Sequence, residues 1–169
     1  VYIMKDKSET SQIFQNFHVM IRNQFDTNIQ IFRSNNACDF FNSILGHYFQ
    51  TYGIIHQSSC VDTPQQNGIA ERKNRHLLEV ARSLLFTSNV PKQFWGKTIL
   101  TATYLINRMP SRILGFKSPS QTLLDAFPNS SHLISHIPLK VFGSVAFVHV
   151  YSQNRGKLDP RATKCIFLG

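Results

Sequence analysis

Apolar residues recur along the chain in two patterns, short continuous runs and three-to-four-residue spacings. The short runs predict strands at residues 1–4, 29–32 and 54–57. The helical spacing predicts amphipathic helices over about residues 8–25 and 39–52. Ser8 is a candidate N-cap of the first helix, and Gly53 is expected to end the second. Strands and helices that alternate at such short intervals favour an α/β layered domain.

A polar loop at residues 58–67 precedes the most regular predicted helix. At about 100° per residue, Glu71 and most of the charged side chains that follow it gather on one side of this helix, with Lys73 somewhat off it, and five apolar side chains gather on the other. These apolar residues are Leu77, Leu78, Ala81, Leu84 and Leu85. One face is therefore expected to pack inward while the other carries charge. Two more helices are predicted, from Pro91 to just before Pro110 and from Ser118 through Leu124.

The C-terminal part of the chain has a different pattern. Residues 128–138 are rich in Asn, Ser, His and Pro and are typical of a linker. Beyond them, Val141–Val150 and Lys164–Leu168 are strand-like and predict a hairpin. The predicted organisation is a core at 1–126, a linker at 127–137 and a partial β module at 138–169.

Composition and cysteines narrow the class of protein. Hydrophobic residues make up 42% of the chain and aromatic residues 12%, which is enough for a packed core. No apolar run approaches the roughly 18 residues of a membrane span, and no secretory signal pattern opens the chain. We therefore expect a soluble intracellular protein, nuclear or cytoplasmic, with no membrane partner. Both ends have the pattern of a segment cut from a longer protein. Three widely spaced cysteines, Cys38, Cys60 and Cys165, favour buried or partly buried free thiols over disulfides or zinc ligands.

Positive charge is concentrated in the middle of the chain. The formal net charge is +9; residues 1–65 carry four Lys/Arg and five Asp/Glu, whereas residues 66–117 carry nine and two. Residues 118–169 carry five and two. The excess thus begins at the Glu71 helix, as expected for a surface that binds phosphate backbones. A generic solvated basic face is the alternative.

Four motifs spread over nearly the whole chain resemble one known family. They are QSSCVDTPQQNGIAERKNRH at 57–76, YLINRMPS at 104–111, KLDPRA at 157–162 and KCIFLG at 164–169. Together they resemble the integrase core of copia-class retrotransposon polyproteins. The resemblance implies a ribonuclease-H-like three-layer fold with its first two strands missing here, followed by the start of an SH3-like β module. It also implies DNA as partner and, in the family, a homo-oligomer.

The resemblance implies a catalytic site in which two aspartates and a glutamate hold two Mg²⁺ or Mn²⁺ ions. Phosphoryl transfer requires an activated oxygen nucleophile and a stabilised leaving oxygen, which a metal pair supplies, and Mg²⁺ prefers oxygen ligands. Glu71 matches the family's glutamate, and residues 36–70, thirty-five in all, separate it from Asn35. In the alternative, Glu71 has only a structural role: it interacts with the helix dipole and forms an ion pair with Arg75.

Asn35 stands where the family has its second aspartate, because the family's Arg-Ser-Asp-Asn-Gly reads Arg-Ser-Asn-Asn-Ala here. A neutral amide oxygen binds a cation weakly and bridges two poorly, so metal binding at Asn35 is expected to be weak or lost. Ala37 would be strained if its position requires positive φ. The first aspartate is expected upstream of Val1. We therefore predict a catalytically inactive integrase fragment; the alternatives are a non-catalytic nucleic-acid-binding module and a decayed reading frame.

Candidate nucleic-acid contacts surround Glu71. They are Arg33, Gln65, Gln66, Asn67, Arg72, Lys73, Arg75 and Arg82. Zinc binding by His56, Cys60 and His76 is disfavoured by their spacing. Phe94 and Trp95 could stack a base, although their apolar spacing favours core packing. Because two strands are expected to be missing, the isolated chain is expected to be marginally folded or prone to aggregate.

Overall fold

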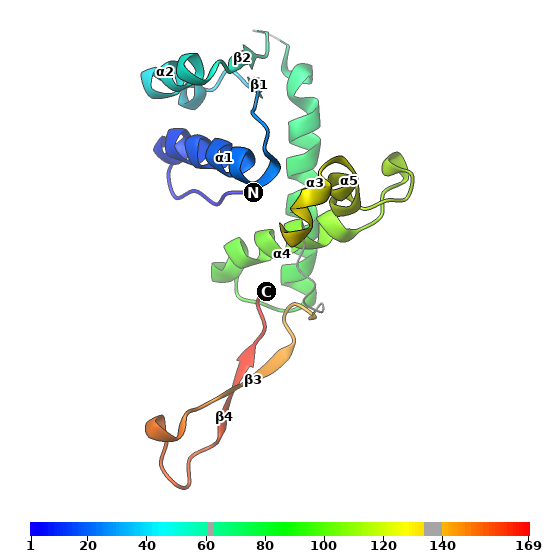
Figure 1. Ribbon diagram of the computed structural model, residues 1–169. Helices are drawn as coiled ribbons and strands as arrows, with labels where there is room; N and C mark the ends of the chain where they lie inside the picture. The colour runs from blue at the N-terminus through cyan, green and yellow to red at the C-terminus, as the bar shows by residue number, and fades with distance from the viewer. Residues whose placement is uncertain (61–62, 134–139) are drawn as a thin grey trace. The chain divides into compact units, whose positions relative to one another are not determined.

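The computed structural model describes residues 1–60, 63–133 and 140–169 (Figure 1). Its contacts divide the chain into two compact units. The first contains Val1–Arg75 and Ser120–Ile134, and the second contains His76–Pro119 and Ser135–Gly169. The helix α3, Gly68–Thr87, begins in the first unit and ends in the second. The described residues include no helix that is long and apolar enough to cross a membrane.

The first unit alternates helices and strands, as the hydrophobic pattern predicts. Its elements are α1 at Thr10–Phe25, β1 at Ile31–Ser34, α2 at Ser43–Tyr52 and β2 at Ile55–Ser58. The two strands are parallel and in register from Ile31 opposite Ile55 to Ser34 opposite Ser58. Gly53 ends α2 in the left-handed conformation, with φ of 65°, which confirms the predicted stop. The α/β class is thus confirmed for this unit.

An aromatic core holds α1 and α2 against the strands. Phe14 of α1 packs edge-on against Phe32 of β1 and Phe49 of α2, with ring centres 4.6 and 5.1 Å apart. Leu45 and Ile54 complete the buried cluster. Edge-to-face geometry adds to the apolar area that these rings remove from water. The same residues were the apolar positions of the predicted helices and strands.

The expected strand at Val1–Met4 does not form. These four residues expose 40–63% of their surface, although Tyr2 contacts Phe17 of α1 through its ring edge. Among the described residues, β1 pairs only with β2, so no strand lies along the other edge of β1. A strand needs a neighbour for its backbone groups, and an apolar sequence alone does not supply one.

Helix starts in the first unit differ from those predicted. Asp6, rather than Ser8, caps the N-terminus in a capping box with Glu9, around a 3-10 helix at Lys7–Glu9. Asp39 lies in a separate 3-10 helix, and α2 begins after Asn42. The Asn42 side chain accepts a hydrogen bond from the Leu45 amide at 2.9 Å, and this cap sets the true start.

In the second unit, the apolar face of α3 packs against α4, Trp95–Arg108, as its periodicity predicts. Ala81, Ile99 and Ala102 form the buried cluster. Trp95 departs from the expected core role, because 53% of its surface is exposed at the first turn of α4. A large aromatic side chain at a helix start extends beyond the packed face.

The predicted hairpin is present and shorter than expected. The strands β3, Val145–His149, and β4, Ala162–Ile166, pair antiparallel. A hydrogen bond connects the start of this hairpin to the end of α3. The Ser88 Oγ donates it to the Phe142 carbonyl at 2.9 Å. Gly143 follows with φ of +79°, and its amide donates to the Phe167 carbonyl. This contact lies entirely within the second unit.

The first part of the predicted linker forms regular structure. Residues 128–133 form a 3-10 helix, and α5 occupies Pro119–Ala126 before it. Phe127 contacts Phe25 of α1 through ring centres 5.1 Å apart, so the first part of this segment packs on α1. Residues 134–137 of the predicted linker lie outside the described residues, as do residues 138–139 of the predicted β module. Cys38 and Cys60 are exposed and Cys165 is half-buried, so burial was wrongly predicted for the first two.

Candidate metal and nucleic-acid site

Asn35 follows directly on β1, in a loop that β2 helps to fix. The Ser34 hydroxyl donates to the Asn35 carbonyl at 2.8 Å and lies 2.8 Å from His56 Nε2. A hydroxyl has one proton to donate, so Ser34 accepts its second bond from an Nε2–H of His56. Burial lowers the pKa of His56, which favours the neutral ring. No sequence pattern indicates this contact, because it joins residues of two separate strands.

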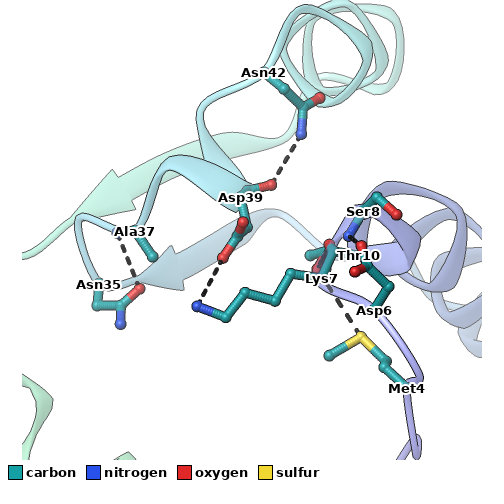
Figure 2. A network of polar contacts seen from close by, with 9 residues as sticks. All are labelled: Met4, Asp6, Lys7, Ser8, Thr10, Asn35, Ala37, Asp39 and Asn42. Carbon is teal, nitrogen blue, oxygen red and sulfur yellow. Dashed lines mark hydrogen bonds and ion pairs between the residues drawn. The ribbon is translucent and has the colours of Figure 1, made fainter.

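The Asn35 side chain is engaged by its own loop. Its Oδ1 accepts a hydrogen bond from the Ala37 amide at 3.2 Å, which closes an Asx turn (Figure 2). Ala37 has φ of −69°, so the strain considered for a residue in place of glycine does not arise. The turn presents one neutral oxygen that already holds a hydrogen bond.

The neighbouring carboxylates serve local structure. Asp39 pairs with Lys7 at 3.6 Å, and Asp6 accepts from the Ser8 amide at 2.8 Å (Figure 2). A hydrogen bond from the Ser8 side chain, and secondarily that amide bond, lower the pKa of Asp6. In the part of the chain that the structure describes, no three His, Cys, Asp or Glu residues come together as a metal site.

Glu71 lies exposed in the first turn of α3. In the part of the chain that the structure describes, Glu71 forms no ion pair with Arg75. The bland alternative of an ion pair four residues apart is therefore not seen. A carboxylate near a helix N-terminus still interacts favourably with the helix dipole.

The three polar residues before α3 were predicted as loop contacts for nucleic acid, and the structure places them in a 3-10 helix, Pro64–Asn67. Gln66 accepts from the Cys60 amide at 3.0 Å, and Asn67 donates to the Ser59 hydroxyl at 3.3 Å. These two side chains brace the preceding loop, whereas Gln65 is exposed. Pro64 at the first turn was the sequence signal for such a helix.

The predicted cationic contacts are all exposed. Arg33 lies on β1, and Arg72, Lys73 and Arg75 lie on the first two turns of α3, all in the first unit. Arg82 lies on the part of α3 that belongs to the second unit. None of them forms an ion pair with a described carboxylate. Exposed unpaired guanidinium groups are suited to bidentate contact with phosphate.

The fold and part of the sequence resemble those of known proteins. A solved intasome of simian T-cell lymphotropic virus, in complex with a PP2A regulatory subunit, is 15% identical, with a TM-score of 0.54 over 94% of this chain and 52% of that one. This similarity shows the fold alone. The profile of the retroviral polymerase SH3-like domain matches residues 144–169, which include the β3–β4 hairpin.

Two plant proteins match the full chain. The Pol polyprotein of transposon TNT 1-94 from Nicotiana tabacum is 40% identical over 169 residues, and that of transposon RE1 from Arabidopsis thaliana is 37% identical. The chain spans only 12% and 11% of the length of these relatives. Both are described as retrovirus-related Pol polyproteins from transposons.

The fold and the intasome match define an α/β chain with the ribonuclease-H-like fold of integrase catalytic cores. Over its whole length the chain is homologous to a segment of the retrovirus-related Pol polyproteins of copia-type plant retrotransposons.

Proposed function

We propose that this chain is a nucleic-acid-binding integrase fragment whose catalytic centre is too weak to join DNA. The observation that carries the proposal is the exposed start of α3, where Arg72, Lys73 and Arg75 follow Glu71 without ion-pair partners among the described residues. We further propose a core through residue 126 and a partial SH3-like module from residue 138. The profile match at 144–169 supports the second boundary.

The proposed metal site consists of Glu71 and Asn35, and the residues present fit a metal pair poorly. Two Mg²⁺ or Mn²⁺ ions would activate the attacking oxygen and stabilise the leaving oxygen in strand transfer. One carboxylate and one neutral amide oxygen supply little of the negative charge that such ions require. The Asn35 oxygen also accepts the Ala37 amide proton. We therefore assign no catalytic step to this pair.

Binding to the phosphate backbone requires only cations with access to solvent. Each neutralised phosphate releases counterions, so affinity falls as salt is raised. On duplex DNA, the logarithm of the binding constant falls with the logarithm of the salt concentration by a slope of about 0.9 per phosphate contact. Three α3 cations together with Arg33 would give a slope of about 3–4. Such contacts are largely independent of sequence. In this proposal the chain acts in the nucleus, where chromosomal DNA is available, as part of a homo-oligomeric integrase.

Fluorescence anisotropy with a labelled duplex tests the proposal. The double variant Arg72→Gln/Arg75→Gln should weaken binding about tenfold and reduce the salt slope by about 2. Lys5→Gln, which removes an exposed cation elsewhere in the first unit, is the matched control and should change the affinity little. An equal loss with both variants, or a flat salt response, would contradict binding through α3.

Strand-transfer and nicking assays test the catalytic part separately. With Mg²⁺ or Mn²⁺, the purified chain should give no joined or nicked product. Metal-dependent product that disappears in Glu71→Gln would overturn the inactive assignment.

A further inference from the structure

A short loop in the second unit, Ser111–Lys117, is held rigid by its own backbone. The Ser111 amide donates to the Lys117 carbonyl at 3.0 Å and closes the base of the loop. The Ser111 carbonyl accepts from the amides of Leu114 and Phe116 at 3.0 and 2.9 Å. Because the backbone supplies these bonds, the shape of the loop does not depend on packing of the side chains at its tip.

The tip of this loop exposes two large apolar side chains. Ile113 is 94% exposed and Phe116 is 75% exposed. Phe116 also has φ of +63°, directly after Gly115 with φ of +61°. A bulky residue in the left-handed region is a genuine outlier, and such strain gathers at binding sites. The loop therefore holds Phe116 outward at a conformational cost that packing within the chain does not explain.

The segment around this loop has one sign of charge. Residues 80–124 contain Arg82, Lys92, Lys97, Arg108, Arg112 and Lys117 and no Asp or Glu. Arg108, three residues before the loop in sequence, stacks on the Tyr104 ring with Cζ 3.4 Å from the ring centre. A segment with this charge balance complements a polyanion.

We propose that Ser111–Lys117 is a second nucleic-acid contact, in which Phe116 and Ile113 insert between bases while Arg112 and Lys117 contact the flanking phosphates. Apolar wedges of this kind unstack base steps in other architectural proteins. The inference rests on the proposed nucleic-acid function and uses residues separate from the α3 cations of the first unit. An anionic membrane surface is the competing polyanion. Nucleic acid is favoured because the segment carries six Lys/Arg without an acidic residue, whereas the apolar tip consists of only two large side chains.

The variant Phe116→Gly separates binding from folding. Glycine adopts positive φ without strain, so the thermal midpoint of the full chain should stay the same or rise while affinity for duplex DNA falls three- to tenfold. Ile113→Ser, at a side chain that is almost fully exposed, should also weaken binding without loss of stability. Leu158→Ser is the matched control, because Leu158 is 99% exposed in another loop of the same unit. It should leave affinity unchanged.

Insertion has its own signal. A duplex that contains 2-aminopurine should become brighter when the native chain binds, because the base unstacks, and should brighten much less with Phe116→Gly. Cosedimentation with phosphatidylserine vesicles tests the membrane alternative. Loss of vesicle binding without loss of DNA binding in Phe116→Gly would overturn the proposal, as would unchanged 2-aminopurine fluorescence.

The outcome for this loop can be distinguished from that for the α3 site. If Arg72→Gln/Arg75→Gln abolishes all DNA binding and Phe116→Gly changes nothing, the proposed function stands and the loop contact is wrong. If both variants bind DNA as the native chain does, both proposals fail.

Discussion

The side-chain oxygen of Asn35 accepts a hydrogen bond from the Ala37 amide at 3.2 Å, two residues along the same loop. An aspartate makes the same Asx turn, because it offers an equivalent acceptor oxygen. The loop can therefore accept a carboxylate at position 35 without refolding. What an aspartate would add is negative charge at the proposed metal site.

Asn35→Asp should consequently strengthen Mn²⁺ binding at the proposed site by about tenfold, or about 1.4 kcal/mol. Isothermal titration calorimetry measures the affinity directly. Adding Glu71→Gln to this variant should remove the gain, while Asp125→Asn, a carboxylate on α5, is the control and should not. Equal affinity in the native chain and in Asn35→Asp would show that position 35 does not face the metal.

His18 predicts how stability depends on pH. It is 1% exposed in α1, Nδ1 lies 3.0 Å from the Tyr48 hydroxyl, and Nε2 has no partner among the described residues. Burial, and secondarily the charge of Arg22, lower the pKa of His18. Burial lowers the pKa of His56 as well.

A histidine with a depressed pKa binds its proton more readily in the unfolded state. Stability should therefore be complete above about pH 6.5, the ordinary value for histidine, and fall as the pH drops below it. Each unit of depression contributes about 1.4 kcal/mol to this loss. Denaturant melts between pH 5 and 8 give the free energy of unfolding at each pH. This free energy should change less with pH in the double variant His18→Phe/Tyr48→Phe, in which the second change avoids an unpaired hydroxyl. His47→Gln, an exposed site on α2, controls for the loss of a histidine in general.

Gly143 should be intolerant of any side chain. Its φ is +79°, and a Cβ added there would lie 2.3 Å from Ser88 Cβ. Gly143→Ala should destabilise the second unit by about 1–3 kcal/mol and speed hydrogen exchange of the amides that join the hairpin to α3. Gly46→Ala is the control, since nothing lies within 4 Å of its added Cβ in α2, and it should be neutral or stabilising by up to about 1 kcal/mol. A native melting temperature for Gly143→Ala would contradict the close packing of Gly143 against Ser88.

The open edge of β1 predicts aggregation. Unpaired backbone groups on an edge strand pair readily with other chains, and Ile31 on this strand is largely exposed. The isolated chain should scatter light increasingly with concentration and melt over a broad temperature range, so that a midpoint is compared only at one fixed, low concentration. Ile31→Lys should slow the aggregation severalfold, whereas Ile44→Lys, an exposed isoleucine on α2, should do less. A cooperative thermal transition of a soluble monomer would be the opposite result.

The spacing of apolar residues predicted the helices and strands correctly wherever one face of the element is buried. The helices around Phe14, Phe49 and Ala81 were predicted because their apolar residues recur at helical spacing and pack as that spacing requires. The predicted helix starts were less accurate. Several polar residues near each start are able to act as the N-cap, and the sequence does not show that Asp6 and Asn42 are the ones that do. Trp95 was misplaced in the core because periodicity does not show where a helix passes beyond its partner.

By itself, the sequence determined the family, the order of helices and strands, the Asn35 substitution and the concentration of positive charge. These depend on residue identity and short-range spacing. Tertiary structure alone decided that Val1–Met4 forms no strand, that Gln66 and Asn67 brace a loop, and that Ser34 joins His56 to Asn35. It also decided that Phe116 is held outward with positive φ. Each of these depends on which backbone and side-chain groups find partners across the fold, and spacing along the chain does not specify those partners.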